Sequence, residues 1–289
     1  MRSLLFVPGN SIRKYEKARG SDADALILDL EDSVAQEAKI AARQTVGHML
    51  RTPATPQKRF VRVNALDTGT TLDDLASILP LAPDGIVLPK CRSGADIHTL
   101  SLWLDGLEAA NGQRPGFTRI IAIATETPES LFGLGTYRDA GPRLLGLMWG
   151  AEDLAACLGA HANSRAGIYE EPFRLARNLC LMGAAASGVM AIDAVCTDIR
   201  NLDHVAAEAV SASRDGFSAK AIIHPSHIEV VNQAFLPREE EIARARRIVS
   251  AIEASPDRGT VNLDGQMIDR PHEKAARKIV AAAEQYGKL

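Results

Sequence analysis

The chain has 289 residues, of which 46% are hydrophobic and 24% are charged, with a formal net charge of -3. This composition is ordinary for a globular protein with a sizeable core, and the charges form no long run of one sign, so nucleic acid is not an expected partner. The length exceeds the commonest single-domain size but suits one barrel of roughly 250 residues with an appendage.

Four cysteines without a Cys-x-x-Cys spacing favour a reducing compartment over a disulfide framework or a zinc site. The chain enters an apolar run at Leu4 with only Arg2 as a charge before it, and no run of 18 apolar residues occurs. Neither an export signal nor a membrane span is therefore expected, and the predicted location is the cytoplasm.

Eight short apolar runs alternate with helix-like stretches, and each run is predicted to form a strand. They span residues 4–7, 25–30, 60–63, 85–88, 120–124, 144–149, 189–195 and 221–223. Runs rich in Val, Ile and Leu indicate strands buried on both faces, and alternation with helices indicates parallel connections. A doubly wound sheet shares these features, but eight repeats favour an α/β fold of the (β/α)8 TIM barrel class, predicted for residues 1–236.

Residues 237–289 are predicted to form a C-terminal helical extension. Glutamates at 239–241, followed by arginines at 244, 246 and 247, are typical of a solvated helix whose first turn is acidic. The segment 255–259 contains Pro and Gly that break this helix, 263–269 indicates a short extended segment, and a second helix is expected from Pro271 onward.

Two acidic residues each follow a predicted buried strand: Glu126 in the motif IATET and Asp153 in WGAEDL. The C-terminal ends of parallel barrel strands meet at one rim, so the two carboxylates are expected to lie together there. Carboxylate oxygens suit a hard divalent cation such as Mg²⁺, which also keeps positions for a bidentate substrate. The alternatives are that Asp153 caps the helix beginning at Leu154 and that Glu126 pairs with an arginine.

Three further acids, Asp29, Glu31 and Asp32, close the second predicted strand. Buried carboxylates need cations, backbone donors or water, and the alternative is a helix N-cap formed by Asp32 or by the following serine. Arg62 ends the third strand, where its guanidinium is expected to grip a ligand carboxylate or to compensate these acids. Lys90 ends the fourth strand with the same two roles open, charge compensation or ligand contact.

Other features are less specific. His224 and His227 have a His-x-x-His spacing, but no third zinc ligand accompanies them, so a barrel-end hydrogen bond is the preferred interpretation. Trp149 is expected to pack in the core. The chain has no phosphate-binding Gly-x-x-x-x-Gly-Lys loop, no Gly-x-Ser-x-Gly elbow and no dinucleotide fingerprint, so nucleotide hydrolysis, serine hydrolase chemistry and hydride transfer have no local support.

Taken in order, a series of motifs resembles the citrate lyase β-subunit-like CoA ester lyases of the HpcH/HpaI aldolase superfamily, which include the malyl-CoA and citramalyl-CoA lyases. The motifs are RSLLFVPG at 2–9, LDLEDSV at 28–34, RVN at 62–64, PK at 89–90, ET at 126–127, GAEDL at 150–154, KAIIHP at 220–225 and DGQMID at 264–269. The resemblance covers nearly the whole chain, and the motifs are specific as a set. One departure is Ala219, where many relatives have glycine before the lysine.

The resemblance implies a TIM barrel with a C-terminal extension that packs on a neighbouring subunit, in a homotrimer or a dimer of trimers. It also implies Mg²⁺, with Mn²⁺ as a substitute, and a CoA thioester as substrate. Glu126 and Asp153 match the family's metal ligands, and Glu126 also faces the substrate. Arg62 matches the arginine that holds the α-keto acid or hydroxyacyl part of the substrate.

Two of the remaining assignments, that of Asp269 and that of the pair Arg13 and Lys17, come from the resemblance alone. Asp269 matches an aspartate of the extension that reaches a neighbouring subunit's site as a catalytic acid or base. Arg13 and Lys17 lie where the family places cations for the phosphates of CoA. Lys90 is assigned to substrate binding, while Asp29, Glu31 and Asp32 are expected to support these residues from behind.

The leading hypothesis is a lyase that cleaves or forms a β-hydroxyacyl-CoA, with acetyl-CoA and glyoxylate or pyruvate as the other reactants. A citryl-CoA lyase subunit and an acyl-CoA thioesterase are alternatives. So are a CoA-independent hydroxy-keto acid aldolase, in which Arg13 and Lys17 would be dispensable, and a non-enzymatic scaffold or ligand sensor. Glyoxylate and pyruvate differ by one methyl group, a difference worth only about 1 to 3 kcal/mol to a pocket, so the sequence does not choose between them.

Overall fold

The structure is a computed structural model that describes residues 1–165, 167–255 and 259–288. It divides into two compact units, Met1–Ala234 and Phe235–Leu289. Among the described residues, no helix is both long and apolar enough to cross a membrane.

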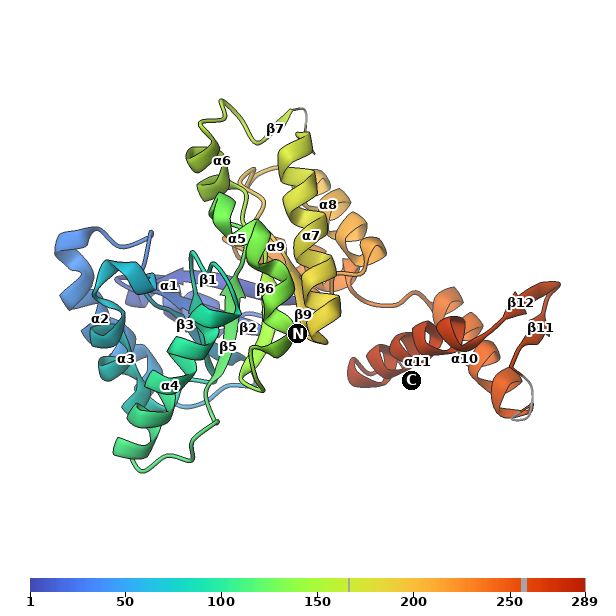
Figure 1. The fold of residues 1–289 in the computed structure, drawn as a ribbon, viewed down its shortest axis with the longest axis horizontal. Coiled ribbons are helices and arrows are strands. Elements are labelled where there is room, and N and C mark those ends of the chain that lie inside the picture. Colours follow the sequence, from blue (N-terminus) through green and yellow to red (C-terminus); the bar gives the residue numbers. More distant parts are fainter. Residues whose placement is uncertain (166, 256–258, 289) are drawn as a thin grey trace. The chain divides into compact units, whose positions relative to one another are not determined.

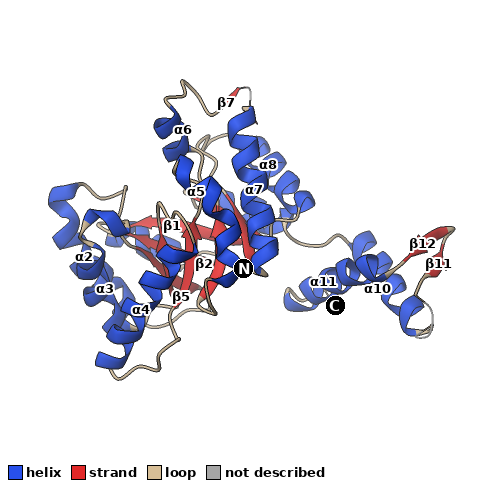
Figure 2. Ribbon diagram, in the orientation of Figure 1, coloured by secondary structure: helices blue, strands red, loops and turns tan. Residues whose placement is uncertain are grey.

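Eight parallel strands of the first unit close into a barrel, in the order β1-β10-β9-β6-β5-β4-β3-β2. Figure 2 shows these strands enclosed by helices. The strands are β1 (Ser3–Pro8), β2 (Ala25–Asp29), β3 (Lys58–Arg62), β4 (Gly85–Leu88), β5 (Arg119–Ile123), β6 (Leu144–Met148), β9 (Met190–Asp193) and β10 (Ala219–Ile222). All eight predicted strands are present, with ends within two residues of the predicted ones, so the predicted (β/α)8 fold is confirmed.

The barrel helices follow the strands in chain order, as Figure 1 shows. They are α1 (Ile12–Arg19), α2 (Lys39–Arg51), α3 (Thr71–Ile78), α4 (Gly94–Ala110), α5 (Pro128–Gly133), α6 (Glu152–Leu158), α7 (Glu171–Ser187), α8 (Leu202–Asp215) and α9 (His227–Ala234). Short 3-10 turns lie at Gln36–Ala38, Leu66–Thr68, Leu79–Leu81 and Leu134–Asp139. Between α6 and α7 the chain also forms a small antiparallel pair, β7 (Ser164–Arg165) and β8 (Ile168–Tyr169), which the sequence did not predict.

The barrel interior is filled by side chains rather than hollow. Residues from successive strands, among them Leu4, Ile27, Phe60, Ile121 and Ile192, form one buried apolar cluster. These strands are continuous in Val, Ile and Leu because their outer faces are covered by helices as well. The interior is therefore closed, and open space for chemistry is left at the ends of the strands.

The second unit pairs two helices with a hairpin. It contains α10 (Glu239–Glu253), β11 (Val261–Leu263), β12 (Gln266–Ile268) and α11 (Arg270–Gln285), with Ile248, Ile268 and Ala276 buried between them. The extended segment expected at 263–269 is the second strand of this hairpin and its flanks. The predicted break at 255–259 includes residues 256–258, which lie outside the described residues.

Candidate active site at the carboxyl end of the barrel

A cavity of about 340 Å³ opens at the C-terminal end of the barrel strands. Its wall takes Phe6 from β1, Asp29 from β2, Arg62 from β3 and Ile123 from β5, together with residues just beyond β5, β6 and β9. Parallel barrels place their chemistry at this end because the strand ends and the loops after them converge there. Five of the residues that the sequence singled out line this wall: Asp29, Asp32, Arg62, Glu126 and Asp153.

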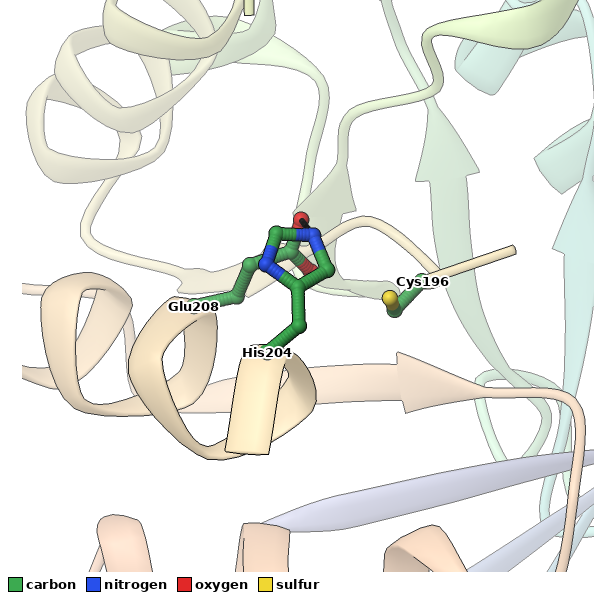
Figure 3. Close-up of side chains that lie close together, drawn as sticks. All are labelled: Cys196, His204 and Glu208. Carbon is green, nitrogen blue, oxygen red and sulfur yellow. Dashed lines mark ion pairs between the residues drawn. The ribbon is translucent and has the colours of Figure 1, made fainter. Parts of the chain in front are cut away.

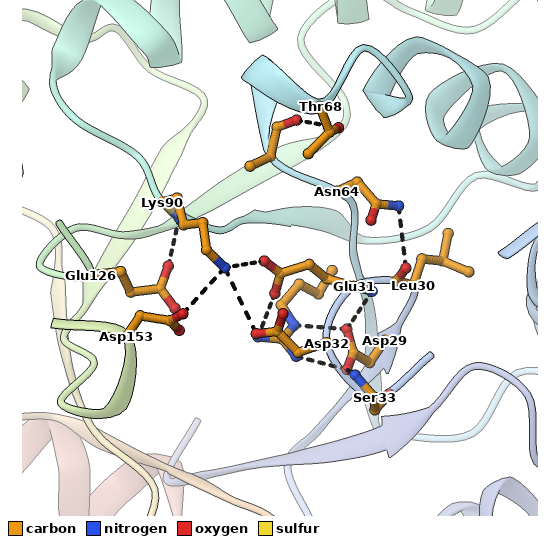
Figure 4. Close-up of polar contacts among 12 residues, drawn as sticks. Asp29, Leu30, Glu31, Asp32, Ser33, Asn64, Thr68, Lys90, Glu126 and Asp153 are labelled. Carbon is orange, nitrogen blue, oxygen red and sulfur yellow. Dashed lines mark hydrogen bonds and ion pairs between the residues drawn. The ribbon is translucent and has the colours of Figure 1, made fainter. Parts of the chain in front are cut away.

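Glu126 and Asp153 are brought to the same side of this cavity, and Figure 4 shows their carboxylates side by side. Glu126 lies just beyond β5 and is 4% exposed, and the backbone N–H of Lys90 donates to its Oε2 at 2.5 Å. Gly150, after β6, leaves room for this side chain, since a Cβ there would lie 3.1 Å from Glu126 Cγ. The neighbouring strand ends are tied by the Gly150 N–H, which donates to Thr125 Oγ1 at 2.9 Å.

The two alternative roles considered for these acids are not what the structure shows. The N-cap position of α6 is Ala151, and Asp153 lies inside the first turn, with a third of its side chain exposed. Among the described residues, Glu126 forms no salt bridge with an arginine, and its direct partner is the Lys90 N–H.

Burial, together with the negative charges of Asp153 and Glu31, raises the pKa of Glu126 to about 8, against the opposing effects of the Lys90 N–H and the Lys90 charge. The carboxyl group is therefore partly neutral at physiological pH when no cation lies beside it. A nearby positive charge would favour the ionised form.

Arg62 is fixed in a carboxylate clamp. Its Nε and Nη2 donate to the two oxygens of Asp29, both at 2.7 Å, and its Nη1 lies 2.9 Å from Glu31 Oε2. Burial alone would raise the pKa of Asp29, but the hydrogen bonds and charge of Arg62 outweigh it and hold this pKa below its ordinary range. The Arg62 side chain is 12% exposed at the cavity wall, so the carboxylates orient it while a small part of it remains accessible from the cavity.

Lys90 links the two groups of acids, as Figure 4 shows. Its ammonium contacts Glu31 Oε1 and lies 3.5 Å from Asp153 and 3.8 Å from Asp32. Its backbone has a φ of 50°, a left-handed conformation that is uncommon for lysine, and in this conformation the N–H and the ammonium serve different acids. Sequence reasoning found Lys90 but gave no sign of this double role.

The charge at this end of the barrel is unbalanced. Among the described residues, the ion pairs and charges around Arg62 and Lys90 involve five carboxyl groups, those of Asp29, Glu31, Asp32, Glu126 and Asp153. Oxygen donors with an excess of negative charge are what a hard divalent cation prefers. The donor set at Glu126 and Asp153 therefore fits such an ion on the chemistry of its own residues.

A buried polar network lies behind the cavity and was not predicted. Trp149, 1% exposed as expected for a core residue, donates from its indole N–H to Asp193 Oδ1 at 2.7 Å. Lys220 is equally buried, and its ammonium lies 2.8 Å from Asp193 and 3.1 Å from Glu208. Burial would raise the pKa of Asp193, but the charges of Lys220 and Arg177 hold it low. Sequence motifs contained Lys220 without indicating its partners, which come from other elements.

Arg13 and Lys17 line a second cavity, of about 510 Å³, beside α1. Its wall also contains Lys14 and His224, and it shares Phe6, Pro8 and Ile223 with the first cavity, so the two adjoin. Helix α1 is capped by Ser11, whose side chain accepts a hydrogen bond from the Lys14 N–H, and the basic side chains of Arg13, Lys14 and Lys17 on this helix are exposed. The pair of cavities thus joins an acidic end to a basic one.

The remaining predicted residues lie elsewhere or act locally. His227 is bonded through Nε2 to the carbonyl of Ile199 at 3.1 Å, which confirms the expected barrel-end hydrogen bond. Asp269 belongs to the second unit, where it is the N-cap of α11 and its carboxylate contacts His272. Cys91, Cys180 and Cys196 are buried free thiols, whereas Cys157 is an exposed free thiol.

A model of the HpcH/HpaI aldolase/citrate lyase family matches residues 2–225. The citrate lyase subunit beta of Escherichia coli K12 is 34% identical over 289 residues, covering 99% of this chain and 94% of that protein. A (3S)-malyl-CoA thioesterase of Cereibacter sphaeroides is 33% identical over 290 residues, covering 98% of this chain and 94% of that protein.

Among solved structures, the crystal structure of CitE from Mycobacterium tuberculosis in complex with magnesium, acetoacetate and coenzyme A superimposes with a TM-score of 0.81. It is 34% identical in sequence, and the match covers 98% of each chain. The family model, the sequence matches over nearly the whole chain and the shared barrel fold all indicate the same family. The chain therefore belongs to the HpcH/HpaI aldolase/citrate lyase family.

Proposed function

We propose that this protein is a Mg²⁺-dependent carbon–carbon lyase. Its substrate would be a β-hydroxyacyl-CoA such as malyl-CoA or citramalyl-CoA, cleaved to, or formed from, acetyl-CoA and glyoxylate or pyruvate. The observation that carries the proposal is the paired carboxylates of Glu126 and Asp153, which face one cavity together with the clamped guanidinium of Arg62. Relatives of the same family, and the magnesium and coenzyme A of the M. tuberculosis structure, support it.

Glu126 and Asp153 are the residues that would hold the metal, because their side chains meet where negative charge is in excess. Bound Mg²⁺, or Mn²⁺ in its place, supplies Lewis-acid polarisation of a carbonyl oxygen. Arg62 would hold the carboxylate of the keto acid, since Asp29 and Glu31 occupy only part of its donor set. The positive charge of Lys90 would offset part of the negative charge of Glu31, Asp32 and Asp153, so that an anionic substrate can bind beside them.

Asp269 is our candidate for the proton-transfer group, acting on a neighbouring subunit of a homotrimer or a dimer of trimers. In cleavage its carboxylate takes the proton of the substrate hydroxyl. The oxygen then forms the carbonyl of the keto acid, and the electrons of the broken C–C bond pass to the acetyl-CoA carbon. That enolate takes a proton back to give acetyl-CoA. Positioned acid–base groups of this kind contribute about 10² to 10⁴-fold in rate.

Subunit sharing can be tested by mixing two inactive variants. Glu126→Gln and Asp269→Asn chains, co-expressed with different tags and purified as mixed assemblies, should regain activity, because some sites then combine an intact Glu126 with an intact Asp269 from the next subunit. In a random mixture roughly a quarter of the sites are intact. Activity of the mixture no higher than that of either variant alone would place Asp269 in its own subunit's site or outside the reaction.

A thioesterase is the second candidate function, because a close match over 98% of this chain is a (3S)-malyl-CoA thioesterase. The same residues would bind the acyl-CoA, but water would attack the thioester and release free CoA. A citryl-CoA lyase subunit, which needs partner subunits, is the third, in view of the E. coli relative.

Condensation distinguishes these functions directly. With Mg²⁺ and acetyl-CoA, isotopically labelled glyoxylate or pyruvate should be incorporated into a CoA ester detected by mass spectrometry. A thioesterase forms no such adduct. Labelled keto acid that never enters a CoA ester, tested with both acceptors, would refute the lyase proposal for these substrates.

The basic cavity predicts a CoA requirement. Changing Arg13 and Lys17 to Ala together removes two of the charges that would face the CoA phosphates and should raise KM for the CoA ester roughly 10-fold or more, with kcat little changed. Lys14→Ala, in the same wall, should add to the effect, whereas Lys278→Ala, on α11, should not. An unchanged KM in the double variant would favour a CoA-independent aldolase.

The raised pKa of Glu126 predicts that the stability of the metal-free protein depends on pH. Its pKa is about 8 in the folded state against an ordinary 4.5, so the fold favours the neutral form. The resulting stability is fully present below about pH 4.5 and is lost as pH rises through 8. The free energy of unfolding of the wild type should therefore fall relative to Glu126→Gln between pH 5 and pH 8, by up to about 4 kcal/mol. Urea unfolding across this range measures it.

Saturating Mg²⁺ should reverse this trend in the wild type, because a bound cation favours the ionised carboxylate. In Glu126→Gln the same addition should have little effect. Parallel stability profiles of the two proteins without metal would contradict the assignment of Glu126 as a buried, high-pKa acid.

A further inference from the structure

A second cluster of metal-ligating side chains lies on α8 and on the loop that follows β9. The sulfur of Cys196, a ring nitrogen of His204 and a carboxylate oxygen of Glu208 all lie within 4.8 Å of one another. Figure 3 shows the Cys196 side chain turned toward His204 and Glu208, which project from the same side of α8. This cluster is separate from the pair formed by Glu126 and Asp153, and none of its three residues lines the first cavity.

The spacing of these atoms suits one ion. His204 and Glu208 are four residues apart on one helix, so their side chains are neighbours, and His204 Nε2 lies 3.2 Å from Glu208 Oε1. Nitrogen and oxygen ligands of one tetrahedral Zn²⁺ lie roughly 3.3 to 3.5 Å apart, given metal–ligand bonds of about 2.0 to 2.2 Å. Cys196 reaches the same point from a different element, which is what a preformed site requires.

The surroundings hold two of these side chains in place. The Asn201 side chain caps α8 at the backbone N–H of His204, and the backbone of Gly167 packs against the imidazole so closely that a Cβ there would lie 2.6 Å from Cε1. Lys220 lies 3.1 Å from Glu208 Oε2, which leaves Oε1 as the oxygen that faces His204. Such support from behind orients ligands in metal sites.

A cavity of about 370 Å³ adjoins the cluster. Cys196, His204 and Glu208 all line it, together with polar side chains that include Asn163 and Asn201. Three protein ligands with open space beside them correspond to a zinc site that keeps a position for water or a small ligand.

We propose that Cys196, His204 and Glu208 form a second metal site, selective for a thiophilic divalent ion of the Zn²⁺ class. Binding exchanges the Cys196 thiol proton, which passes to solvent, for a metal–sulfur bond. A thiolate and an imidazole disfavour Mg²⁺, so the site is chemically distinct from the carboxylate pair at Glu126 and Asp153. Ala194 and Val195, which line the first cavity, directly precede Cys196, so an ion here would also restrain that wall.

Cobalt(II) titration tests the site without any assay of activity. Protein freed of transition metals and kept in excess Mg²⁺ should bind one Co²⁺ per chain with a sulfur-to-metal charge-transfer band in the near ultraviolet, and Zn²⁺ should displace the Co²⁺. Cys196→Ser should abolish the band, and His204→Gln should weaken Co²⁺ binding at least about 10-fold. Circular dichroism identifies any variant that has not folded. The two substitutions lie on different elements, the loop after β9 and helix α8, so each tests the site separately.

Two matched variants complete the experiment. Cys157→Ser changes the exposed thiol outside the cluster and should keep the band, as should Glu126→Gln, which changes the other site. Absence of the band in the wild type would overturn the proposal, and so would its persistence in folded Cys196→Ser or its loss in Glu126→Gln.

Discussion

Glu126→Gln is expected to lower kcat for the CoA ester by roughly 10³-fold, while the protein stays folded. The amide keeps the shape of the side chain and an oxygen that accepts from the Lys90 N–H, but it removes the negative charge that a cation would need. A loss of about 4 kcal/mol of transition-state stabilisation, within what a Lewis-acid metal supplies, corresponds to this factor. Steady-state rates at increasing Mg²⁺ measure both the rate and the metal requirement.

A suitable control is Glu129→Gln, which makes the same chemical change three residues further along, at an exposed position in the first turn of α5. It should turn over substrate at the wild-type rate. The assignment of Glu126 as a metal ligand fails if Glu126→Gln keeps more than a tenth of the wild-type kcat at saturating Mg²⁺. Such activity would mean that the negative charge of Glu126 is not needed to bind the cation.

Arg62→Lys should lower kcat/KM by roughly 10²-fold. Lysine keeps the charge but is a point donor, so it cannot bind Asp29 with two parallel hydrogen bonds, contact Glu31 and still offer a planar edge to a substrate carboxylate. Arg62→Ala is a poorer test, because it leaves the buried carboxylate of Asp29 without its cation and Glu31 with Lys90 alone, and would cost about 3 to 5 kcal/mol of stability.

Arg59→Lys is the matched control for this arginine. Arg59 lies on the same strand, β3, but its guanidinium donates to the carbonyls of Leu50 and Thr52, away from the cavity. Its kcat/KM should stay within about twofold of the wild type. Equal effects of the two substitutions would mean that Arg62 acts through the stability of β3 rather than through the substrate.

The barrel and its acidic rim were accessible from the sequence because both depend on local patterns. Continuous apolar runs mark strands covered on both faces, and a parallel barrel brings their C-terminal ends together, so Glu126, Asp153 and Arg62 could be placed at one end. The motif resemblance added roles for Asp269, Arg13 and Lys17 that no spacing indicates, and those roles remain predictions.

Other features depend on three-dimensional packing that no local pattern encodes. The backbone of Lys90 is left-handed, and no glycine or asparagine at this position indicates it in the sequence. Lys220 and Asp193 lie on two different strands and Trp149 directly follows a third, and Cys196 meets His204 only because the loop after β9 returns toward α8. Pairings of this kind appear only when the chain is folded.

The product balance of cleavage tests the central claim most directly. Malyl-CoA and citramalyl-CoA are each incubated with the protein and Mg²⁺, the keto acid is trapped as a hydrazone, and free CoA is measured with a thiol reagent after the protein, which carries the exposed Cys157, has been removed. We predict glyoxylate or pyruvate in equal amount to acetyl-CoA, with no free CoA. Free CoA without keto acid would contradict carbon–carbon cleavage and identify a thioesterase.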